Sequence, residues 1–160
     1  MKGLVLTIGT VAAALSLTFG LSAASASSNS AAASTKVAAA NSKLGRILVD
    51  ARGRTLYLFA KDRNGKSACS GSCAVYWPPL IASGTPKAGA GAKQSLLGTT
   101  RRADGRMQVT YRHHPLYRYA GDSAKGQTNG QGLNASGGLW WVLSPAGNKI
   151  ALMAAPATGY

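Results

Sequence analysis

The sequence predicts an all-β protein made of two β-hairpin repeats, and three observations lead to this prediction. The stretch 45–62 recurs at 105–122 without a gap, with eight of 18 positions identical, and such internal repetition decides the architecture. Within each copy, two runs of strand-forming residues flank a short turn. A Trp-x-x-Leu element follows each copy. We expect repeat 1 (about 44–80) and repeat 2 (about 104–143) to pack as one small barrel- or sandwich-like domain with a pseudo-twofold axis.

Residues 1–26 have the pattern of a secretory signal peptide. Lys2 provides the positive charge, the run 4–19 is uncharged and apolar, and residues 24–26 fit a small-x-small cleavage site. The alternative is an uncleaved membrane anchor, for which the apolar run is short. No cysteine lies near the predicted cut, so bacterial N-terminal lipidation has no site. We therefore expect a secreted protein, periplasmic or extracellular, without a lipid anchor and without a transmembrane span after cleavage.

Composition divides the rest of the chain into parts. Residues 27–43 are rich in Ser, Ala and Asn without apolar periodicity, and are expected to form a flexible leader. Residues 44–153 carry the repeats and are long enough for an independent all-β core. Within them, 82–93 is rich in Gly, Ala, Pro and Ser and is predicted to be a connector. Residues 154–160 are expected to be a loose tail.

Each copy is expected to fold as a hairpin. In repeat 1, the runs 47–49 and 55–59 are rich in β-branched and apolar residues, and the Gly-containing turn 51–54 separates them. In repeat 2, apolar and polar residues alternate over 107–111, with the period of two of a half-buried strand. The run 116–120 is the expected return strand.

Alternation also assigns the faces of these strands. Tyr57 and Phe59 share one side of their strand, as do Tyr117 and Tyr119. The opposite side is also apolar in the first copy, so we expect that strand to be central. In the second copy Arg118 lies on the opposite side, which is therefore expected to meet water.

The Trp-x-x-Leu elements lie at 77–80 and 140–143. The second predicts a strand at 139–143, followed by a turn at 145–148 and a last strand at 150–153. In the first, two consecutive prolines cannot donate ladder hydrogen bonds, so Trp77 is expected to end a loop or to lie at a sheet edge.

The chain is strongly basic, with 18 Lys and Arg, only 4 Asp and a formal net charge of +14. Such a charge suits an anionic cell-envelope polymer or an anionic lipid surface. The alternative is that the charge only keeps an exported protein soluble. No specific nucleic-acid site is indicated. The side chains expected to contact an anion are Arg46, Arg52, Arg54, Arg101, Arg102, Arg106, Arg112 and Arg118.

Cys69 and Cys73 are the only cysteines, and such a pair in an exported chain is predicted to form a disulfide. Closing so short a loop contributes about 2 kcal/mol. The alternatives are a redox-active pair or a metal site. Redox dithiols usually have the spacing C-x-x-C, and two thiolates alone do not complete a zinc shell.

His113 and His114 are the only histidines, and both lie in the predicted turn of the second hairpin. Adjacent residues on an extended chain point apart, so one metal ion seldom binds both. A solvated turn is the favoured interpretation, and a surface-bound transition metal is the alternative. No other cofactor is predicted.

Asp62 and Asp122 follow their aromatic strands at identical spacing. The favoured role is structural, with each carboxylate accepting backbone N–H bonds that close the strand end. The alternative is that both meet across the pseudo-twofold axis, as calcium ligands or as the acid–base pair of a hydrolase. The four aromatic residues before them are expected in the core, with an open ledge for sugars or nucleobases as the alternative. The chain contains no Ser-His-Asp order, Walker loop or HExxH motif.

Both copies match the pattern Y-x-[FWY]-x-x-D, at 57–62 and 117–122. The segments around them complete a wider pattern: Gly53–Tyr57, Cys69–Cys73, Trp77–Leu80 and Pro115–Tyr117. In these residues the chain resembles the bacterial "secreted repeat of unknown function" family, predicted lipoproteins that carry this motif. The resemblance covers about 44–147, and it implies a bacterial, exported, envelope-associated protein with tandem repeats and no agreed activity.

Two features depart from the family pattern. The lipid-attachment cysteine of many members is absent, and Arg112-His113 stands where members often carry Asn-Gly. From all these observations we expect a non-catalytic binding or structural module that associates with anionic envelope components. The alternatives are a metal-binding or redox module that uses the His pair or the Cys pair, and a hydrolase that uses Asp62 and Asp122.

Overall fold

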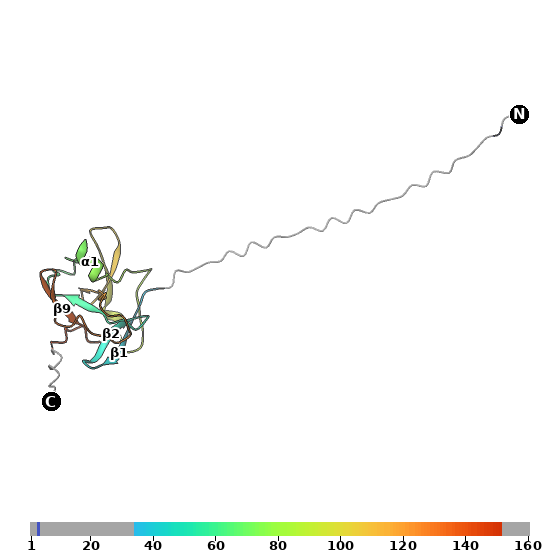
Figure 1. Cartoon of the computed structure of the whole chain (residues 1–160). Helices are drawn as coiled ribbons and strands as arrows, with labels where there is room; N and C mark the ends of the chain where they lie inside the picture. Colours follow the sequence, from blue (N-terminus) through green and yellow to red (C-terminus); the bar gives the residue numbers. More distant parts are fainter. Residues whose placement is uncertain (1–2, 4–33, 152–160) are drawn as a thin grey trace.

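The structure of the chain is a computed structural model that describes Gly3 and residues 34–151 (Figure 1). Apart from Gly3, the signal peptide predicted at 1–26 lies outside the described residues, as do residues 27–33 of the predicted leader and the tail predicted at 154–160. The described part is mostly β-strand, with one short α-helix and one short 3₁₀ helix.

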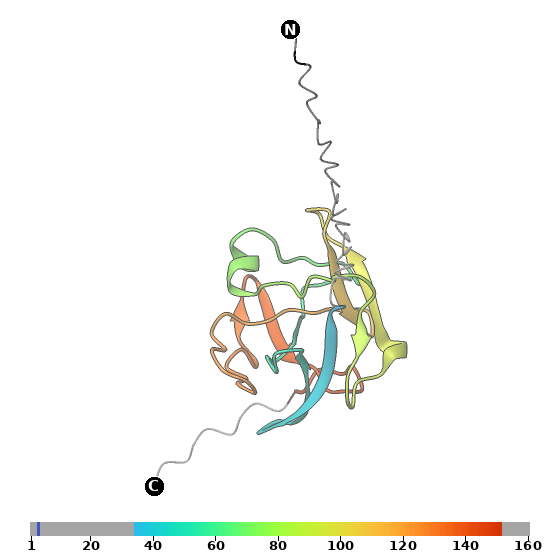
Figure 2. The same cartoon turned by 90° about the vertical axis from the view of Figure 1, so that its right-hand side faces the viewer.

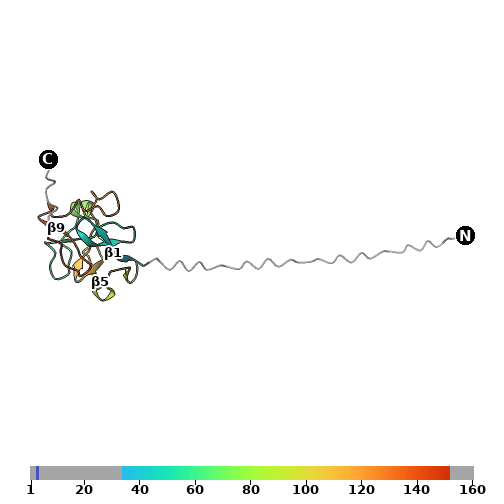
Figure 3. The same ribbon diagram turned by 90° about the horizontal axis from the view of Figure 1, so that it is seen from below.

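The strands form three small sheets, with the orders β2-β1-β4, β3-β9-β8 and β5-β6-β7. Figure 2 shows β5 and β6 on one side of the body and β9 on the other, and Figure 3 shows β1, β5 and β9 from below. All-β architecture is thus confirmed, and no closed barrel forms among the residues that the structure describes. The elements are β1 (Lys36–Ser42), β2 (Gly45–Asp50), β3 (Tyr57–Phe59), α1 (Ser72–Tyr76), β4 (Lys87–Ala88), η1 (Gln94–Leu96), β5 (Leu97–Arg101), β6 (Met107–Tyr111), β7 (His114–Pro115), β8 (Asn134–Ala135) and β9 (Gly138–Val142).

Strand β1 lies in the segment for which composition predicts a flexible leader, and for residues 36–42 that prediction was wrong. β1 pairs antiparallel with β2 from Val37 to Ser42 and parallel with β4 at its start. Val37 is fully buried, whereas the three alanines that follow it are only partly buried. The strand is therefore held mainly by ladder hydrogen bonds to β2 and β4, which leave no periodic pattern in its own sequence.

The first predicted hairpin exists only near its turn. Val49 bridges to Thr55, and the Leu56 N–H donates to the Leu48 carbonyl at 3.0 Å. Beyond Leu56 the chain leaves β2, and β3 pairs antiparallel with β9 instead. The two strands of the first copy therefore belong to different sheets.

The second hairpin is tight, with β6 and β7 joined by Arg112 and His113 alone. Both residues have positive φ angles, 48° and 66°, which is the type I′ pattern that Asn-Gly ordinarily fills. The return strand predicted at 116–120 was misplaced, because the strand that pairs with β6 is β7, two residues long and just before that range. After β7, the chain continues only through isolated bridges from Tyr117.

Two apolar clusters lie on opposite sides of the strands, because side chains alternate along each of them. One cluster contains the leucines of the first copy with their neighbours: Leu48, Leu56, Leu58, Leu80, Val109, Tyr111, Leu116, Trp141 and Leu143. The other contains the aromatic motif residues, the tryptophans of the Trp-x-x-Leu elements and the cysteines: Ile47, Val49, Tyr57, Phe59, Cys69, Cys73, Trp77, Tyr117, Trp140 and Val142. The first copy is apolar on both faces, as its sequence predicts.

The predicted disulfide is confirmed, since Cys69 and Cys73 are bonded with a Cα–Cα separation of 5.4 Å. The chain between and after them forms α1, a helix of five residues that the sequence did not predict. The Trp77 N–H caps this helix on the Cys73 carbonyl. The bridge therefore shapes the turn from which Trp77 enters the second cluster.

Candidate functional site

The two copies meet at Tyr57 and Tyr117, which occupy equivalent motif positions. The Tyr57 N–H donates to the Tyr117 carbonyl at 2.9 Å, and the Tyr117 N–H donates to the Tyr57 carbonyl at 3.0 Å. Their hydroxyls also reach across, because Tyr57 Oη donates to Asp122 Oδ2 at 2.6 Å and Tyr117 Oη donates to Asp62 Oδ2 at 2.8 Å. Each tyrosine thus bonds the aspartate of the other copy.

The second oxygen of each aspartate accepts a backbone N–H from the loop that follows it. Asp62 Oδ1 accepts from Ala68 at 2.7 Å, and Asp122 Oδ1 accepts from Asn129 at 2.9 Å. Each carboxylate therefore joins the end of its own aromatic strand, its own loop and the tyrosine of the other copy. Nothing in one copy alone signals the tyrosine partner, because the bonded residues are separated by 65 and 55 positions.

Burial sets the electrostatics of this pair of contacts. It raises the pKa of Asp62 to about 6, and the hydrogen bonds from Ala68 and Tyr117 oppose that rise. Burial also raises the pKa of Asp122, and the Tyr57 hydroxyl opposes it. Burial and the neighbouring carboxylates raise the pKa of both tyrosines, so each remains a neutral O–H donor at neutral pH.

Four rings from the two copies stack in alternating order. Phe59 stacks on Trp140 with centroids 4.1 Å apart, Trp140 on Trp77 at 3.9 Å, and Trp77 on Tyr119 at 4.3 Å. Tyr119 is partly exposed, and the other three rings are buried. Most of the aromatic surface of the motif is therefore buried in the packing between the two copies.

Arg102 is buried, although the sequence places it among the anion-binding candidates. Its Nη1 donates to Gln108 Oε1 at 2.7 Å and to Ser67 Oγ at 2.8 Å, and its Nη2 donates to the Cys69 carbonyl at 2.7 Å. The Ser67 hydroxyl also donates to Tyr117 Oη at 2.8 Å, because the single proton of Tyr117 is donated to Asp62. A network of hydrogen bonds thus connects the loop after Asp62 to repeat 2. The sequence did not predict this network, because nothing in the sequence of a basic chain distinguishes a buried arginine from an exposed one.

The remaining candidate arginines differ in whether they pair with a carboxylate and in how far they are exposed to solvent. Arg106 and Arg102 share Asp104, at 2.7 and 3.4 Å, and the hydrogen bonds from Arg106 help to lower the pKa of Asp104 to about 2. Arg118 pairs with the buried Asp50 at 2.8 Å, with its side chain 36% exposed. Arg54 is partly buried, and the other candidates are exposed to solvent: Arg46, Arg52, Arg101 and Arg112.

His113 and His114 line one hollow of about 440 Å³ together with Asp62. His113 is exposed and His114 is about half-buried. Burial and then the charges of Arg112 and His113 lower the pKa of His114, so its ring is neutral at pH 7. Among residues 34–151, no group of three or more His, Cys, Asp or Glu side chains is arranged to hold a metal ion.

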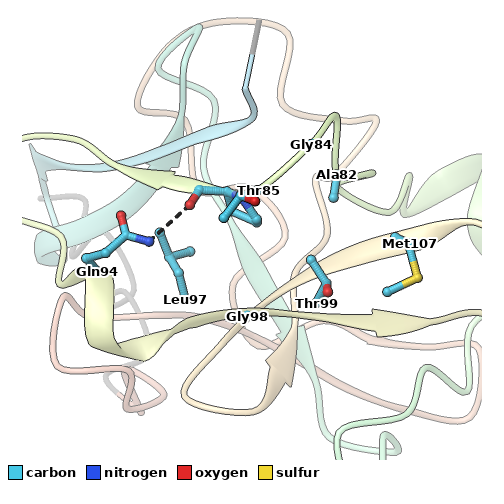
Figure 4. A pocket seen from close by; sticks show the side chains of 9 residues that line it. Ala82, Gly84, Thr85, Gln94, Leu97, Gly98, Thr99 and Met107 are labelled. Atoms are coloured by element: carbon cyan, nitrogen blue, oxygen red, sulfur yellow. Dashed lines mark hydrogen bonds between the residues drawn. The ribbon is translucent and has the colours of Figure 1, made fainter. Parts of the chain in front are cut away.

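A second hollow, of about 460 Å³, lies between the segment 82–86, β5 and the start of β6 (Figure 4). Gln94 closes one end through a hydrogen bond from its Nε2 to the Pro86 carbonyl at 3.0 Å. Leu97 and Thr99 lie along its floor, and Met107 lies at the opposite end (Figure 4). No ionisable side chain lines this hollow, so it offers no group for acid–base chemistry.

The fold and these contacts define the class, a basic all-β protein whose two sequence repeats are bonded to each other through their motif residues. The chain belongs to the family described as the secreted repeat of unknown function, whose model matches it twice, at residues 38–81 and 98–144. The resemblance inferred from the sequence is thereby confirmed. Comparisons with curated proteins and with solved structures find no match. In the described part of the chain, no helix is both long and apolar enough to cross a membrane.

Proposed function

We propose that this protein is an exported, non-catalytic module of the cell envelope that associates with an anionic polymer or lipid surface through its Lys and Arg side chains. One observation carries the proposal: all four aspartates are engaged by partners within the chain. Asp62 and Asp122 bond tyrosines, Asp50 pairs with Arg118 and Asp104 with Arg106. The chain contains no glutamate, so the exposed cations act together as a positive field.

These cations are spread over two of the three sheets and over the turns and loops around them. Arg46 and Arg52 belong to β2 and its turn, Lys87 to β4, and Arg101 to β5. Lys125 lies in the loop after Asp122 and packs against Gly53. A distributed charge of this kind suits a repeating polyanion or a charged surface better than one small substrate.

The Y-x-[FWY]-x-x-D motif has a structural role in this proposal. The reciprocal bonds of the tyrosines and the alternating ring stack support a packing of the two copies about a pseudo-twofold axis. Both oxygens of Asp62 and of Asp122 already accept hydrogen bonds, so the motif aspartates serve the fold rather than a reaction.

The proposal is tested by the salt dependence of binding. The mature chain is applied to immobilised polyphosphate, and retention should fall steeply with added salt because cation–anion contacts release counterions. The charge-reversed variant R46E/R52E/R101E should elute at distinctly lower salt. The control S70E/S83E/S123E also adds three acids at exposed positions but removes no arginine, and should shift elution less. Retention that does not respond to salt would contradict the proposal.

A further inference from the structure

A third hollow, of about 470 Å³, lies beside β3 and β9 at the turn between β6 and β7. We call it the Arg112 groove. Leu58 and Trp141, a cross-strand pair of β3 and β9, form its apolar wall. Arg112, His114 and Lys149 supply its cationic and titratable side chains. No carboxylate lines it, so its two permanent charges are both positive.

Arg112 is held in place by neutral partners. Its Nη1 donates to Asn148 Oδ1 and, at 3.5 Å, to the Ala146 carbonyl. Gly147 packs against it so closely that a Cβ there would lie 2.7 Å from Arg112 Cβ. These contacts orient the guanidinium without cancelling its charge, which is the condition for binding an external anion with a pre-organised fork.

Lys149 supplies a second cation at the same groove. Its Nζ lies 5.4 Å from the centroid of the Trp141 ring, so a cation–π contact orients it. The positive electrostatic potential of the site also acts on His114. Burial lowers the pKa of His114, and the charges of Arg112 and His113 lower it further. Two fixed cations thus converge beside an apolar wall.

The backbone adds an independent observation. Arg112 and His113 both have positive φ, a conformation that is unfavourable for residues with an ordinary side chain. The same two-residue turn is formed without that cost by Asn-Gly. Strain of this kind, retained at a hollow with charged walls, indicates a functional requirement for the side chains.

We propose that the Arg112 groove is a specific subsite for one phosphate or carboxylate group carried by a sugar or polyol unit of an anionic polymer. Arg112 and Lys149 bind the anionic oxygens, and the carbon skeleton of the unit lies against Leu58 and Trp141. The inference rests on the proposed function and adds to it a defined site and a ligand class.

The test uses the mature chain and two charge-matched variants. R112Q/K149Q removes the two cations of the groove, and R101Q/K87Q removes two exposed cations from β5 and β4. Inorganic phosphate is titrated by NMR at constant ionic strength, and soluble polyphosphate and phosphatidylglycerol vesicles are compared as polymer and lipid sources. We expect phosphate to shift the Trp141 indole and the amides of 147–149, and R112Q/K149Q to abolish these shifts. The same variant should weaken polyphosphate binding at least fivefold more than R101Q/K87Q does, and vesicle binding no more than R101Q/K87Q does.

The outcomes separate the subsite from the general proposal. If both variants weaken polyphosphate binding equally and phosphate shifts no groove resonance, the subsite is refuted while the general association stands. If the groove variant selectively weakens only vesicle binding, the polymer assignment is refuted. If neither polyphosphate nor vesicles bind, both proposals fail. K149Q alone leaves the turn unchanged, so a selective loss in that variant supports the subsite even if the double variant is unstable.

Discussion

Two tyrosine hydroxyls make equivalent contacts in this protein, yet their acceptors differ in burial. Asp122 is 1% exposed, whereas Asp62 is only partly buried and faces the hollow beside His114. A buried carboxylate that loses its hydrogen-bond donor cannot accept a hydrogen bond from water instead. The free-energy cost of removing that carboxylate from water is then not offset. The two contacts should therefore contribute unequally to stability.

We expect Tyr57→Phe to destabilise the fold by about 2 kcal/mol and Tyr117→Phe by about 1 kcal/mol. Each hydroxyl has a second partner, but that of Tyr57 is the buried Gly130 N–H, whereas that of Tyr117 is the Ser67 hydroxyl, which can rotate to another acceptor. Urea unfolding of the mature chain gives both values. Tyr76→Phe is the control, because Tyr76 is 63% exposed and the loss of its hydroxyl should change the stability little. Equal costs at positions 57 and 117 would show that burial of the acceptor does not decide the strength of the contact.

The raised pKa of Asp62 predicts an unusual response to pH. Its folded value is about 6, whereas an unfolded aspartate titrates near 3.9. Between these values the folded chain holds a proton that the unfolded chain has released, so the contribution of Asp62 to stability falls as pH rises from about 4 to about 6. Asp122, whose pKa is also raised, acts in the same direction. Asp104, with a pKa of about 2, loses its contribution only as pH falls below about 4.

Raising the pH from 4.5 to 7 should lower the urea midpoint of the wild-type relative to that of Asp62→Asn. His114, whose pKa is lowered, acts in the opposite direction but equally in both proteins. The variant removes the titrating group but keeps an oxygen that can accept from Ala68 or Tyr117. Circular dichroism at the two pH values measures both midpoints. An identical pH response in the wild-type and the variant would mean that Asp62 titrates normally.

At the scale of elements, local pattern predicts what local sequence determines. The strand predicted at 139–143 is β9, and the alternation at 107–111 is β6, because each has enough apolar and β-branched residues to mark its own face. Strand β1 was missed because its small residues gain their order from β2 and β4. Helix α1 was missed because its five residues, which include Cys73 of the disulfide, are too few to show a helical period.

The β6–β7 turn allows a direct test of backbone strain. His113→Gly should stabilise the protein by several tenths of a kcal/mol up to about 1 kcal/mol. Glycine adopts positive φ without a steric cost, and the extra backbone entropy of glycine in the unfolded chain offsets only part of this gain. The control is Ala51→Gly in the turn after β2, where φ is not positive and glycine should destabilise. Thermal unfolding measures both. If His113→Gly destabilises as Ala51→Gly does, the turn carries no strain that glycine relieves.

The disulfide gives a prediction for the α1 element. C69S/C73S should lower the free energy of unfolding by about 2 kcal/mol, the value for closing so short a loop. Cys69 is 1% exposed and its carbonyl accepts from Arg102, so the loop also anchors that buried cation. Chemical denaturation with and without reductant separates the effects, since reductant should change the wild-type and leave the variant unaffected. A variant as stable as the wild-type would leave the bridge without a stabilising role.

At the scale of the whole molecule, the sequence predicts the duplication but not how the copies are joined. Eight identities show that two equivalent units exist, and the period-two pattern shows that they are strands. The sequence does not show that β3 pairs with β9 rather than with β2. Nor does it show that Phe59 stacks on Trp140 and Tyr119 on Trp77. These contacts join residues far apart in sequence, and a single chain carries no signal of which distant partners meet. The Arg112 groove was missed for the same reason, because Trp141, Lys149 and Arg112 come together only in the folded chain.

This interleaving of the copies predicts that neither is a folding unit by itself. Residues 34–91 alone would expose Phe59 and Trp77 without Trp140 and Tyr119, and residues 92–151 alone would lack β1, β2 and β3. We expect each fragment to be unfolded, without near-ultraviolet circular dichroism or a cooperative transition, because a chain of this size needs the whole core to offset its conformational entropy. Mixed in equal amounts, the oxidised first fragment and the second fragment should recover the aromatic signal, since the contacts between Tyr57, Tyr117 and the two aspartates form across the cut. The mixture made with Trp77→Ala and Tyr57→Phe in the first fragment should not recover it. A fragment that unfolds cooperatively without its partner would show that each copy folds independently and that the crossed contacts are incidental to the architecture.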